Sequence, residues 1–291
     1  MKIRIGTRKS RLALIQTDMF IAAVKKEFPD IETEIVNIST KGDEIIDRPL
    51  EKIGGKGVFT DAIESALLEK RIDFAVHSAK DMPSDITEGL CVGAVLRRAS
   101  PVDVTVFRKG FVPSDEMIIG TSSTRRSYGI SKLYAHAVLK DIRGNVDTRL
   151  NKLHNGEYDC IILAAAGLER LGAFDDSRFD FVRLPTDIIM PAPCQGIIAI
   201  QSRRDEFAEI LSRIDHTDTM YAYETERAIL RLMGAGCSSP LGALAEIKGD
   251  RIDIQISTDQ KSISSDGGDI TKRLIIAERL VKRICAERSS L

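Results

Sequence analysis

The sequence predicts a mixed α/β protein with two successive α/β lobes and a small C-terminal α+β domain. Short apolar runs alternate with helical patterns through most of the chain, which is typical of lobes built on largely parallel sheets. Many of these runs end in a polar turn rich in Gly, Ser and Thr. After residue 216 the order changes to a helix, strands and a last helix. A length of 291 residues fits two or three domains.

The first lobe begins with a strand at residues 2–7 and a helix for which Ser10 is the expected N-cap. A strand at 32–38 and a helix at 60–70 follow, and a third strand begins at Asp73. This βαβαβ order favours a largely parallel sheet. The first helix is predicted to bury Leu12, Ile15, Met19, Ala22 and Ala23. The second is predicted to bury Ile63, Ala66 and Leu67.

The stretch DFAVHSAKDMPS, residues 73–84, joins a buried strand to a polar end. Open α/β sheets bind ligands outside the carboxyl ends of their strands, so the side chains that follow this strand are site candidates. Lys80 lies next to Asp81, and its charge favours the ionised carboxylate. A solvated loop is the alternative. We select Asp81 as the leading functional residue.

A glycine-rich loop around Lys56 precedes that stretch. Its sequence, GGKG, lacks the GxxxxGK[ST] pattern of a P-loop. We therefore expect a flexible loop that holds Lys56 near a ligand.

The second lobe repeats the alternation of strands and helices. Strands are predicted at residues 102–107, 117–120, 137–142 and 158–165. The turn TSSTRRS places hydroxyls, backbone N–H groups and two arginines at a helix N-terminus, which is a favourable place for an anion. Simple N-capping by Ser122 or Ser123 is the alternative, and we favour anion binding because capping does not explain the arginines.

The second lobe ends in a Pro-rich turn, residues 190–196, that we interpret as a hinge. A strand at 197–200 leads back from this hinge. Further elements are predicted as a helix at 225–233, strands at 242–247 and 252–258, and a helix at 270–286.

The charge distribution favours a local anion site over a nucleic-acid surface. The formal net charge is −1 and the pI about 6.5, whereas general nucleic-acid binders are basic. Trp is absent, so base-stacking platforms are not expected. Arginines recur near Gly, Ser and Thr, an arrangement suited to carboxylates or phosphates. They are Arg8, Arg11, Arg97, Arg98, Arg125, Arg126, Arg143, Arg149 and Arg170.

The five cysteines include no CxxC pair, so neither a disulfide framework nor a zinc site is expected. Cys91, Cys160 and Cys285 have apolar neighbours and are predicted to be small buried residues. Cys237 instead lies in the turn GAGCSSP, where it is a reactive thiol or an idle loop residue. No apolar run approaches the roughly 20 residues that span a bilayer, and the N-terminus has no apolar signal core. A cytoplasmic location is expected.

Nine motifs in order resemble those of the porphobilinogen deaminase family, the hydroxymethylbilane synthases. They extend over almost the whole chain: IGTRKSRLALIQT, STKGD, GGKGVFT, DFAVHSAKDMPS, GTSSTRRS, DIRGNVDTRL, ILAAAGLERLG, PAPCQGIIAI and GAGCSSPLGA. Each motif is weak evidence by itself, and the shared order and spacing make the resemblance specific. It departs mildly at Thr124 and Ala235, and Cys194 stands where the family often has glycine.

The resemblance implies two periplasmic-binding-protein-like lobes around a cleft and a small third domain. The corresponding boundaries are 1–94 with 193–216 for domain 1, 95–192 for domain 2 and 217–291 for domain 3. It also implies a dipyrromethane cofactor, bound covalently through a thioether to Cys237. Cys194 is a second candidate for a reactive thiol. A monomer in the cytoplasm is expected.

The resemblance further implies a role for each site residue. Asp81 matches the catalytic aspartate. The residues that would hold the cofactor besides Cys237 are Lys80, Thr121, Ser122, Ser123, Arg125, Arg126 and Gln195. Those that would hold substrate are Arg8, Ser10, Arg143, Arg149 and Arg170. Lys56 and Phe59 would belong to a mobile loop over the cleft.

The implied partners are porphobilinogen and the growing polypyrrole chain, and no nucleic acid, membrane, metal or obligate protein partner is expected. Every pyrrole carries an acetate and a propionate, so a growing chain is polyanionic and the arginines suit it. One fixed carboxylate could stabilise the positive charge that develops on a pyrrole nitrogen, both when ammonia leaves and when the new C–C bond forms. The alternatives are a cytoplasmic anion-binding protein without catalysis and a nucleic-acid module.

Overall fold

The computed structural model describes residues 1–40, 60–234, 239–260 and 262–289. The chain forms two compact units. The first contains Met1–Arg98 and Ile197–Met220, and the second contains Ala99–Gly196 and Tyr221–Leu291. Each unit is described by itself below, and the division into three domains stays a prediction.

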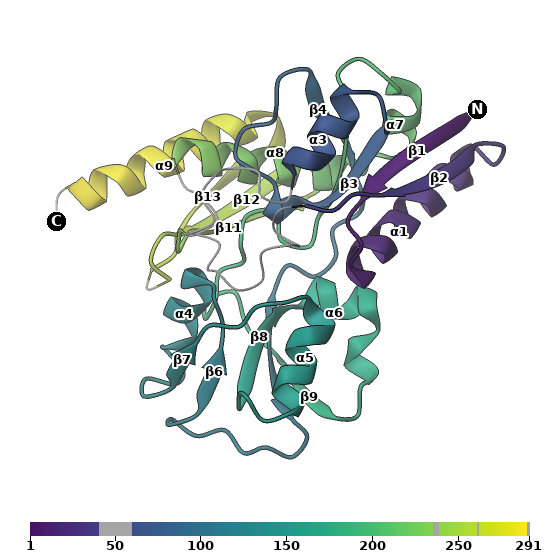
Figure 1. Ribbon diagram of the computed structural model, residues 1–291. Helices are drawn as coiled ribbons and strands as arrows, with labels where there is room; N and C mark the ends of the chain where they lie inside the picture. Colours follow the sequence, from purple (N-terminus) through teal and green to yellow (C-terminus); the bar gives the residue numbers. More distant parts are fainter. Residues whose placement is uncertain (41–59, 235–238, 261, 290–291) are drawn as a thin grey trace. The chain divides into compact units, whose positions relative to one another are not determined.

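The first unit contains a five-stranded sheet in the order β2-β1-β3-β10-β4 (Figure 1). Its strands are β1 (Lys2–Thr7), β2 (Glu32–Asn37), β3 (Phe74–Ser78), β4 (Leu90–Val95) and β10 (Ile198–Arg203). β1 pairs in parallel with β2 and with β3. β10 is antiparallel to both β3 and β4. The sheet is therefore largely parallel, as predicted, with one returning strand inserted.

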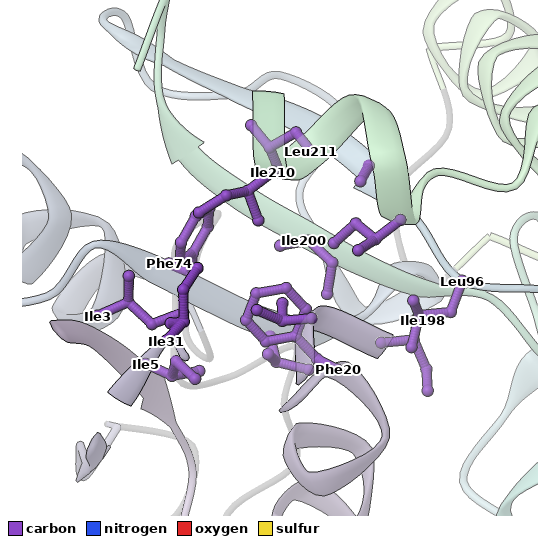
Figure 2. Close-up of a cluster of buried hydrophobic side chains, with 14 residues drawn as sticks. Ile3, Ile5, Phe20, Ile31, Phe74, Leu96, Ile198, Ile200, Ile210 and Leu211 are labelled. Atoms are coloured by element: carbon purple, nitrogen blue, oxygen red, sulfur yellow. The ribbon is translucent and has the colours of Figure 1, made fainter. Parts of the chain in front are cut away.

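Two apolar cores lie on this sheet, and helices of the unit contribute to both. The helical segments are α1 (Arg11–Glu27), α3 (Asp61–Leu68), η2 (Ala79–Asp81) and α7 (Ala208–Ile214). Helices α1 and α7 contribute to one core, and α3 contributes to the other. Figure 2 shows how Phe20 of α1 lies against the strand residues Phe74, Ile198 and Ile200. The rings of Phe20 and Phe74 meet edge to face, with centroids 5.3 Å apart. In α3 the predicted residues Ile63, Ala66 and Leu67 are buried, which confirms that face.

Helix α1 begins as predicted but packs through another face. Ser10 is its N-cap, with Oγ accepting from the Ala13 N–H at 3.3 Å. The predicted apolar face is wrong, because Met19 is exposed. The buried positions of the helix are Gln16, Thr17, Phe20 and Val24. Two polar side chains can occupy a buried face here because each has a hydrogen-bond partner within the lobe.

The second unit contains a second five-stranded sheet in the order β7-β6-β8-β5-β9. Its strands are β5 (Asp103–Arg108), β6 (Ile118–Gly120), β7 (Val138–Lys140), β8 (Cys160–Ala164) and β9 (Phe179–Arg183). β6 is parallel to β7 and β8, and β5 is antiparallel to β8 and β9. The helical segments are α4 (Thr124–Ile130), α5 (Val146–His154), α6 (Ala165–Leu171) and η3 (Ala173–Asp175). β5 is thus antiparallel to both of its neighbours, as β10 is in the first sheet.

The C-terminal part of the chain is an antiparallel sheet, β11-β12-β13, with a long helix packed on it. Its elements are α8 (Thr217–Leu232), β11 (Gly242–Lys248), β12 (Arg251–Ser257), β13 (Ser264–Asp269), η4 (Ile270–Lys272) and α9 (Arg273–Ser289). Ile252, Ile254 and Ile256 of β12 form one core with Ile276 and Leu280 of α9. The predicted class of two α/β lobes and a small α+β domain is confirmed.

Five helices and strands of the described residues were not predicted from the sequence: β4, β9, β13, α5 and α7. Helix α8 also begins eight residues before the predicted start at 225. β13 has the sequence SSDGGD, which has no apolar alternation. It pairs with β12 through backbone hydrogen bonds along its whole length, so side-chain patterning could not reveal it.

Candidate functional site

In the first unit, predicted site residues follow two neighbouring parallel strands. Arg8 and Ser10 come after β1, and Lys80 and Asp81 come after β3 within η2. Because β1 and β3 are paired in parallel, their carboxyl ends lie at one edge of the sheet, the usual position of a ligand site. The Asp81 side chain is exposed there, while Lys80 is partly buried. This edge therefore presents the accessible carboxylate of Asp81 beside the neighbouring residue Lys80.

A hydrogen-bonded chain of polar side chains lies behind this edge, and its members His77, Gln201 and Glu64 are buried. His77 Nε2 is 2.9 Å from Gln201 Oε1, and Gln201 Nε2 donates to Glu64 Oε1 at 2.6 Å. The Thr87 hydroxyl donates to Glu64 Oε2 at 2.5 Å. Burial lowers the pKa of His77 to about 4, against smaller opposing effects that include the carboxylate of Asp81. His77 is therefore neutral at neutral pH and adds no charge to the edge.

The end of β3 is also held to helix α1. Gln16 Nε2 donates to the Ser78 hydroxyl at 2.9 Å. Gln16 is buried even though it is polar, and this contact supplies its partner. The bond fixes the residue from which η2 starts, two positions before Lys80. Sequence reasoning missed this contact because the two residues lie 62 positions apart.

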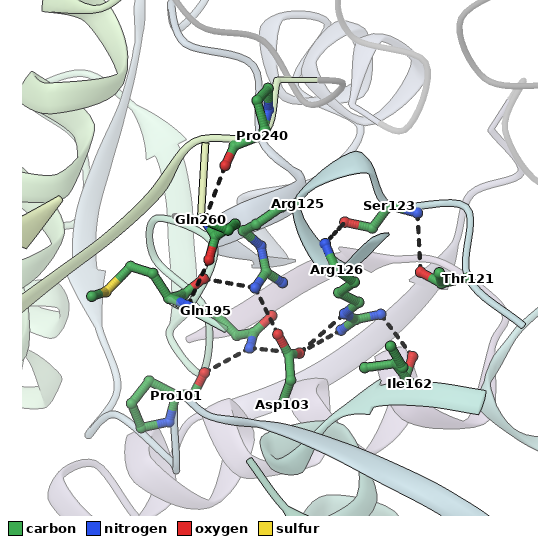
Figure 3. Close-up of polar contacts among 11 residues, drawn as sticks. Pro101, Asp103, Thr121, Ser123, Arg125, Arg126, Ile162, Gln195, Pro240 and Gln260 are labelled. Carbon is green, nitrogen blue, oxygen red and sulfur yellow. Dashed lines mark hydrogen bonds and ion pairs between the residues drawn. The ribbon is translucent and has the colours of Figure 1, made fainter. Parts of the chain in front are cut away.

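In the second unit, Asp103 is the centre of a buried charged cluster (Figure 3). This residue begins β5 and is fully buried. Its carboxylate accepts from Arg125 Nη1 at 2.7 Å, from Arg126 Nη2 at 2.8 Å and from Gln195 Nε2 at 3.1 Å. Burial alone would raise the pKa of Asp103, but the two guanidinium charges hold it well below its usual range. Two cations around one anion leave the cluster with a net charge of +1.

The TSSTRRS turn is held by contacts within the protein. Ser123 caps α4 and accepts from the Arg126 N–H at 3.5 Å. Thr121 Oγ1 accepts from the Ser123 N–H at 3.2 Å, and Ser122 Oγ donates to the Ile142 carbonyl at 3.0 Å. The capping alternative is therefore observed at Ser123, and both arginines point to Asp103. Cofactor binding by this turn stays a prediction.

Three further predicted arginines follow the strands of the second sheet. Arg143 is partly buried beyond β7, and Arg149 Nε donates to the Gly144 carbonyl at 2.8 Å. Arg170 Nη2 donates to the Gly196 carbonyl at 2.6 Å. Its buried Nε has no hydrogen-bond partner among the described residues, and burial lowers the pKa of Arg170 to about 10. An unsatisfied donor on a buried cation is costly, so this position suits an anionic ligand.

Two cysteine predictions are corrected. Cys194, the second candidate for a reactive thiol, is fully buried, which disfavours that role. Its φ of +63° lies in the left-handed region, which explains why glycine suits this position. Cys285 is exposed, not buried. Cys160 is buried as predicted, and burial raises its pKa to about 12. Cys91 is partly buried.

Lys56, Phe59 and Cys237 lie outside the described residues. Within the described ranges, no group of His, Cys, Asp and Glu could hold a metal ion. No described helix is both long enough and apolar enough to cross a bilayer.

Comparison with known proteins shows the family. Residues 3–210 match the family model "Porphobilinogen deaminase, dipyromethane cofactor binding domain", and residues 220–287 match "Porphobilinogen deaminase, C-terminal domain". The porphobilinogen deaminase of Acetivibrio thermocellus is 46% identical, with 87% of this chain and 86% of that protein covered. Those of Listeria monocytogenes serovar 1/2a and Syntrophomonas wolfei are each 43% identical, with 84% and 87% of this chain and 81% and 83% of those proteins covered.

Among solved structures, the Bordetella pertussis BvgS periplasmic VFT2 domain is similar with a TM-score of 0.43 and 11% identity, covering 77% of this chain and 92% of that one. The matches to both family models carry the assignment. The chain therefore belongs to the porphobilinogen deaminase family, transferases of porphyrin and heme biosynthesis with a dipyrromethane cofactor.

Proposed function

We propose that the chain catalyses the complete hydroxymethylbilane synthase reaction. In this reaction four porphobilinogen molecules are deaminated and condensed head to tail on a covalent dipyrromethane primer, and the linear tetrapyrrole is then released by water. The observation that carries the proposal is an exposed carboxylate, Asp81, at the end of β3, in a chain whose family binds that primer. An anion-binding protein without catalysis is not favoured by the family match.

Asp81 is the proposed catalytic residue. Departure of ammonia and formation of each new C–C bond both place positive charge on a pyrrole nitrogen. A fixed carboxylate stabilises that charge and can accept or return a proton. The 3-10 turn η2 holds Asp81 directly after a buried strand, so its backbone is anchored while its side chain stays accessible.

The proposed attachment point of the cofactor is a thioether at Cys237. When bound, the dipyrromethane supplies the free α-carbon to which the first substrate is joined. Lys80, Thr121, Ser122, Ser123, Arg125, Arg126 and Gln195 are the residues proposed to hold it. The donor set fits an acidic group, because the cluster of Asp103, Arg125 and Arg126 has one more positive than negative charge. That excess positive charge favours the binding of carboxylates near the carboxyl end of β6, where the TSSTRRS turn begins.

The substrate and the elongating chain are proposed to bind to Arg8, Ser10, Arg143, Arg149 and Arg170. The unpartnered Nε of Arg170 supports this proposal, since a carboxylate would satisfy it. Each charge-assisted bond of this kind contributes about 1.5–3 kcal/mol. We further propose a cytoplasmic monomer that needs no nucleic acid, membrane or protein partner.

Replacement of Asp81 by Asn tests the catalytic assignment. Asp81→Asn keeps the size and the hydrogen-bonding shape of the side chain but removes its charge, so turnover should fall by about a hundredfold or more. Steady-state bilane formation measures this, and circular dichroism should show an unchanged fold. The matched control is Asp85→Asn, an exposed residue four positions later, which should retain normal turnover. Near-normal turnover of Asp81→Asn would reject the assignment.

A further inference from the structure

Gln260 is a buried polar residue in an uncommon backbone conformation. It lies between β12 and β13, is only 1% exposed, and has a φ of +60°. Residues other than glycine adopt this left-handed conformation rarely, and they keep it where surrounding contacts hold them there. In this conformation the side-chain amide of Gln260 forms hydrogen bonds with two backbone groups.

Both ends of the Gln260 amide bind backbone groups from distant parts of the sequence. Its Oε1 accepts from the Met190 N–H at 2.8 Å, and its Nε2 donates to the Pro240 carbonyl at 3.0 Å (Figure 3). Because one partner is a donor and the other an acceptor, only one orientation of the amide satisfies both. The side chain therefore connects the Pro-rich segment at Met190 to the start of the C-terminal sheet.

Met190 carries this connection to the charged cluster. Its carbonyl accepts from Arg125 Nη1 at 2.7 Å, and the same nitrogen donates to Asp103 Oδ2 at 2.7 Å. A continuous hydrogen-bonded path thus runs from Asp103 through Arg125, Met190 and Gln260 to Pro240. All of these residues belong to the second compact unit.

The Met190 segment is held firmly enough to act as a fixed point. Met190 is 1% exposed, and a Cβ added at Gly242 would lie 2.6 Å from the Met190 Cβ. The next residue, Pro191, accepts from the Ala243 N–H at 2.9 Å. Close packing on one side and a backbone bond on the other leave Met190 little freedom. Movement of Pro240 relative to Asp103 therefore requires the Gln260 contacts to break.

We infer that Gln260 is a positioning residue that fixes Pro240, three residues after Cys237, relative to the Asp103–Arg125 pair. The inference rests on the proposed attachment of the cofactor to Cys237 and on the proposed role of Arg125 in holding it. Loss of the Gln260 bonds frees Pro240 to shift relative to Asp103, and a misplacement of about 1 Å can reduce a rate by about a hundredfold. Substrate binding through other arginines does not depend on this bond.

Two variants of Gln260 remove different parts of the link. Gln260→Met keeps the length of the side chain and removes both hydrogen bonds. Gln260→Glu keeps the acceptor for the Met190 N–H, but its ionised form cannot donate to the Pro240 carbonyl. Its protonated form can donate again, and burial raises the pKa of a carboxyl group. Gln255→Met, on strand β12 of the same hairpin, is the matched control.

The experiment compares kcat and KM of the holoenzymes, after intact mass has shown equal loading with porphobilinogen-derived cofactor. Gln260→Met should lower kcat about tenfold or more and change KM by less than about twofold, whereas Gln255→Met should change neither. The kcat of Gln260→Glu, divided by that of wild type at the same pH, should rise as the pH falls from 8 to 6. Gln260→Met should show no such rise.

A kcat of Gln260→Met within about twofold of the Gln255→Met value would overturn the inference. The inference would also be overturned if the kcat of Gln260→Glu, divided by that of wild type, did not change with pH. This second test can be made even if Gln260→Met does not fold. Failure of the proposed function is distinct from both results, because wild-type protein would then gain no cofactor and form no bilane.

Discussion

Asp103 and His77 are both buried, but the protein keeps Asp103 ionised and His77 neutral. Asp103 is ionised because two guanidinium groups surround it. His77 is neutral because burial disfavours its charged form and its hydrogen-bond partner, Gln201, is uncharged. A buried charge needs a partner, and a buried neutral ring needs only a hydrogen bond. This difference makes one residue sensitive to substitution and the other sensitive to pH.

Neutralisation of Asp103 should destabilise the second unit strongly. Asp103→Asn leaves Arg125 and Arg126 buried beside a neutral amide, and removal of one partner from a buried ion pair costs about 3–5 kcal/mol. Urea unfolding followed by circular dichroism measures the loss. The control is Asp180→Asn, because Asp180 pairs with Lys109 on the surface, where such pairs contribute about 0–1 kcal/mol. Equal losses for the two variants would contradict a special role for the cluster.

The pKa of His77 predicts that stability falls in mild acid. The unfolded chain binds a proton on this ring below about pH 6.5, whereas the folded protein does so only below about pH 4. The unfolded state therefore binds more protons between these values, and its free energy falls relative to the folded state as the pH falls. Between pH 7 and pH 5 this residue should lower the free energy of unfolding by about 2 kcal/mol.

Urea unfolding at the two pH values measures this effect by comparison with variants. His77→Gln should show a smaller loss between pH 7 and pH 5 than wild type, by about that amount. His136 is exposed, so His136→Gln should match the wild type. An unchanged loss in His77→Gln would show that His77 does not carry the effect.

Among the elements, those with a strong apolar pattern were predictable and those held by backbone pairing were not. β1, β3 and α3 follow their patterns closely because their apolar residues are buried in the two cores of the first sheet. The buried face of α1 was missed because Gln16 and Thr17 occupy it, and their partners cannot be identified from local sequence. β13 was missed because its contribution to the sheet comes from its backbone.

The adjacent glycines of β13 test how closely this strand approaches its neighbour. A Cβ at Gly267 would lie 2.8 Å from the Ile252 carbonyl oxygen, a backbone atom that cannot easily move. A Cβ at Gly268 would come closest to the Ile276 Cδ1, at 3.1 Å, which is the end of a flexible side chain. Gly267→Ala should therefore cost about 1–3 kcal/mol, and Gly268→Ala should cost less. Urea unfolding ranks them, and the reverse order would contradict the close approach.

At the scale of the whole molecule, a formal net charge of −1 conceals local excesses of positive charge. Asp103 neutralises only one of its two arginines, and Arg170 retains a buried donor without a described partner. The sequence predicted which arginines to consider, because they follow strands and lie in turns. It could not predict Asp103 as the partner of Arg125 and Arg126, nor the buried contacts of Glu226 and Gln260. Glu226 accepts from the Cys194 N–H, and Gln260 binds Met190, contacts that only the fold brings together.

We propose that this chain builds a dipyrromethane on Cys237 and extends it. The intact mass of purified protein before and after incubation with porphobilinogen, followed by peptide mapping, tests this directly. We expect an added mass of two porphobilinogen units, each less ammonia, on the peptide that contains Cys237, together with formation of bilane. An adduct on another cysteine would contradict the anchor. Absence of both adduct and bilane after incubation would contradict the catalytic function itself.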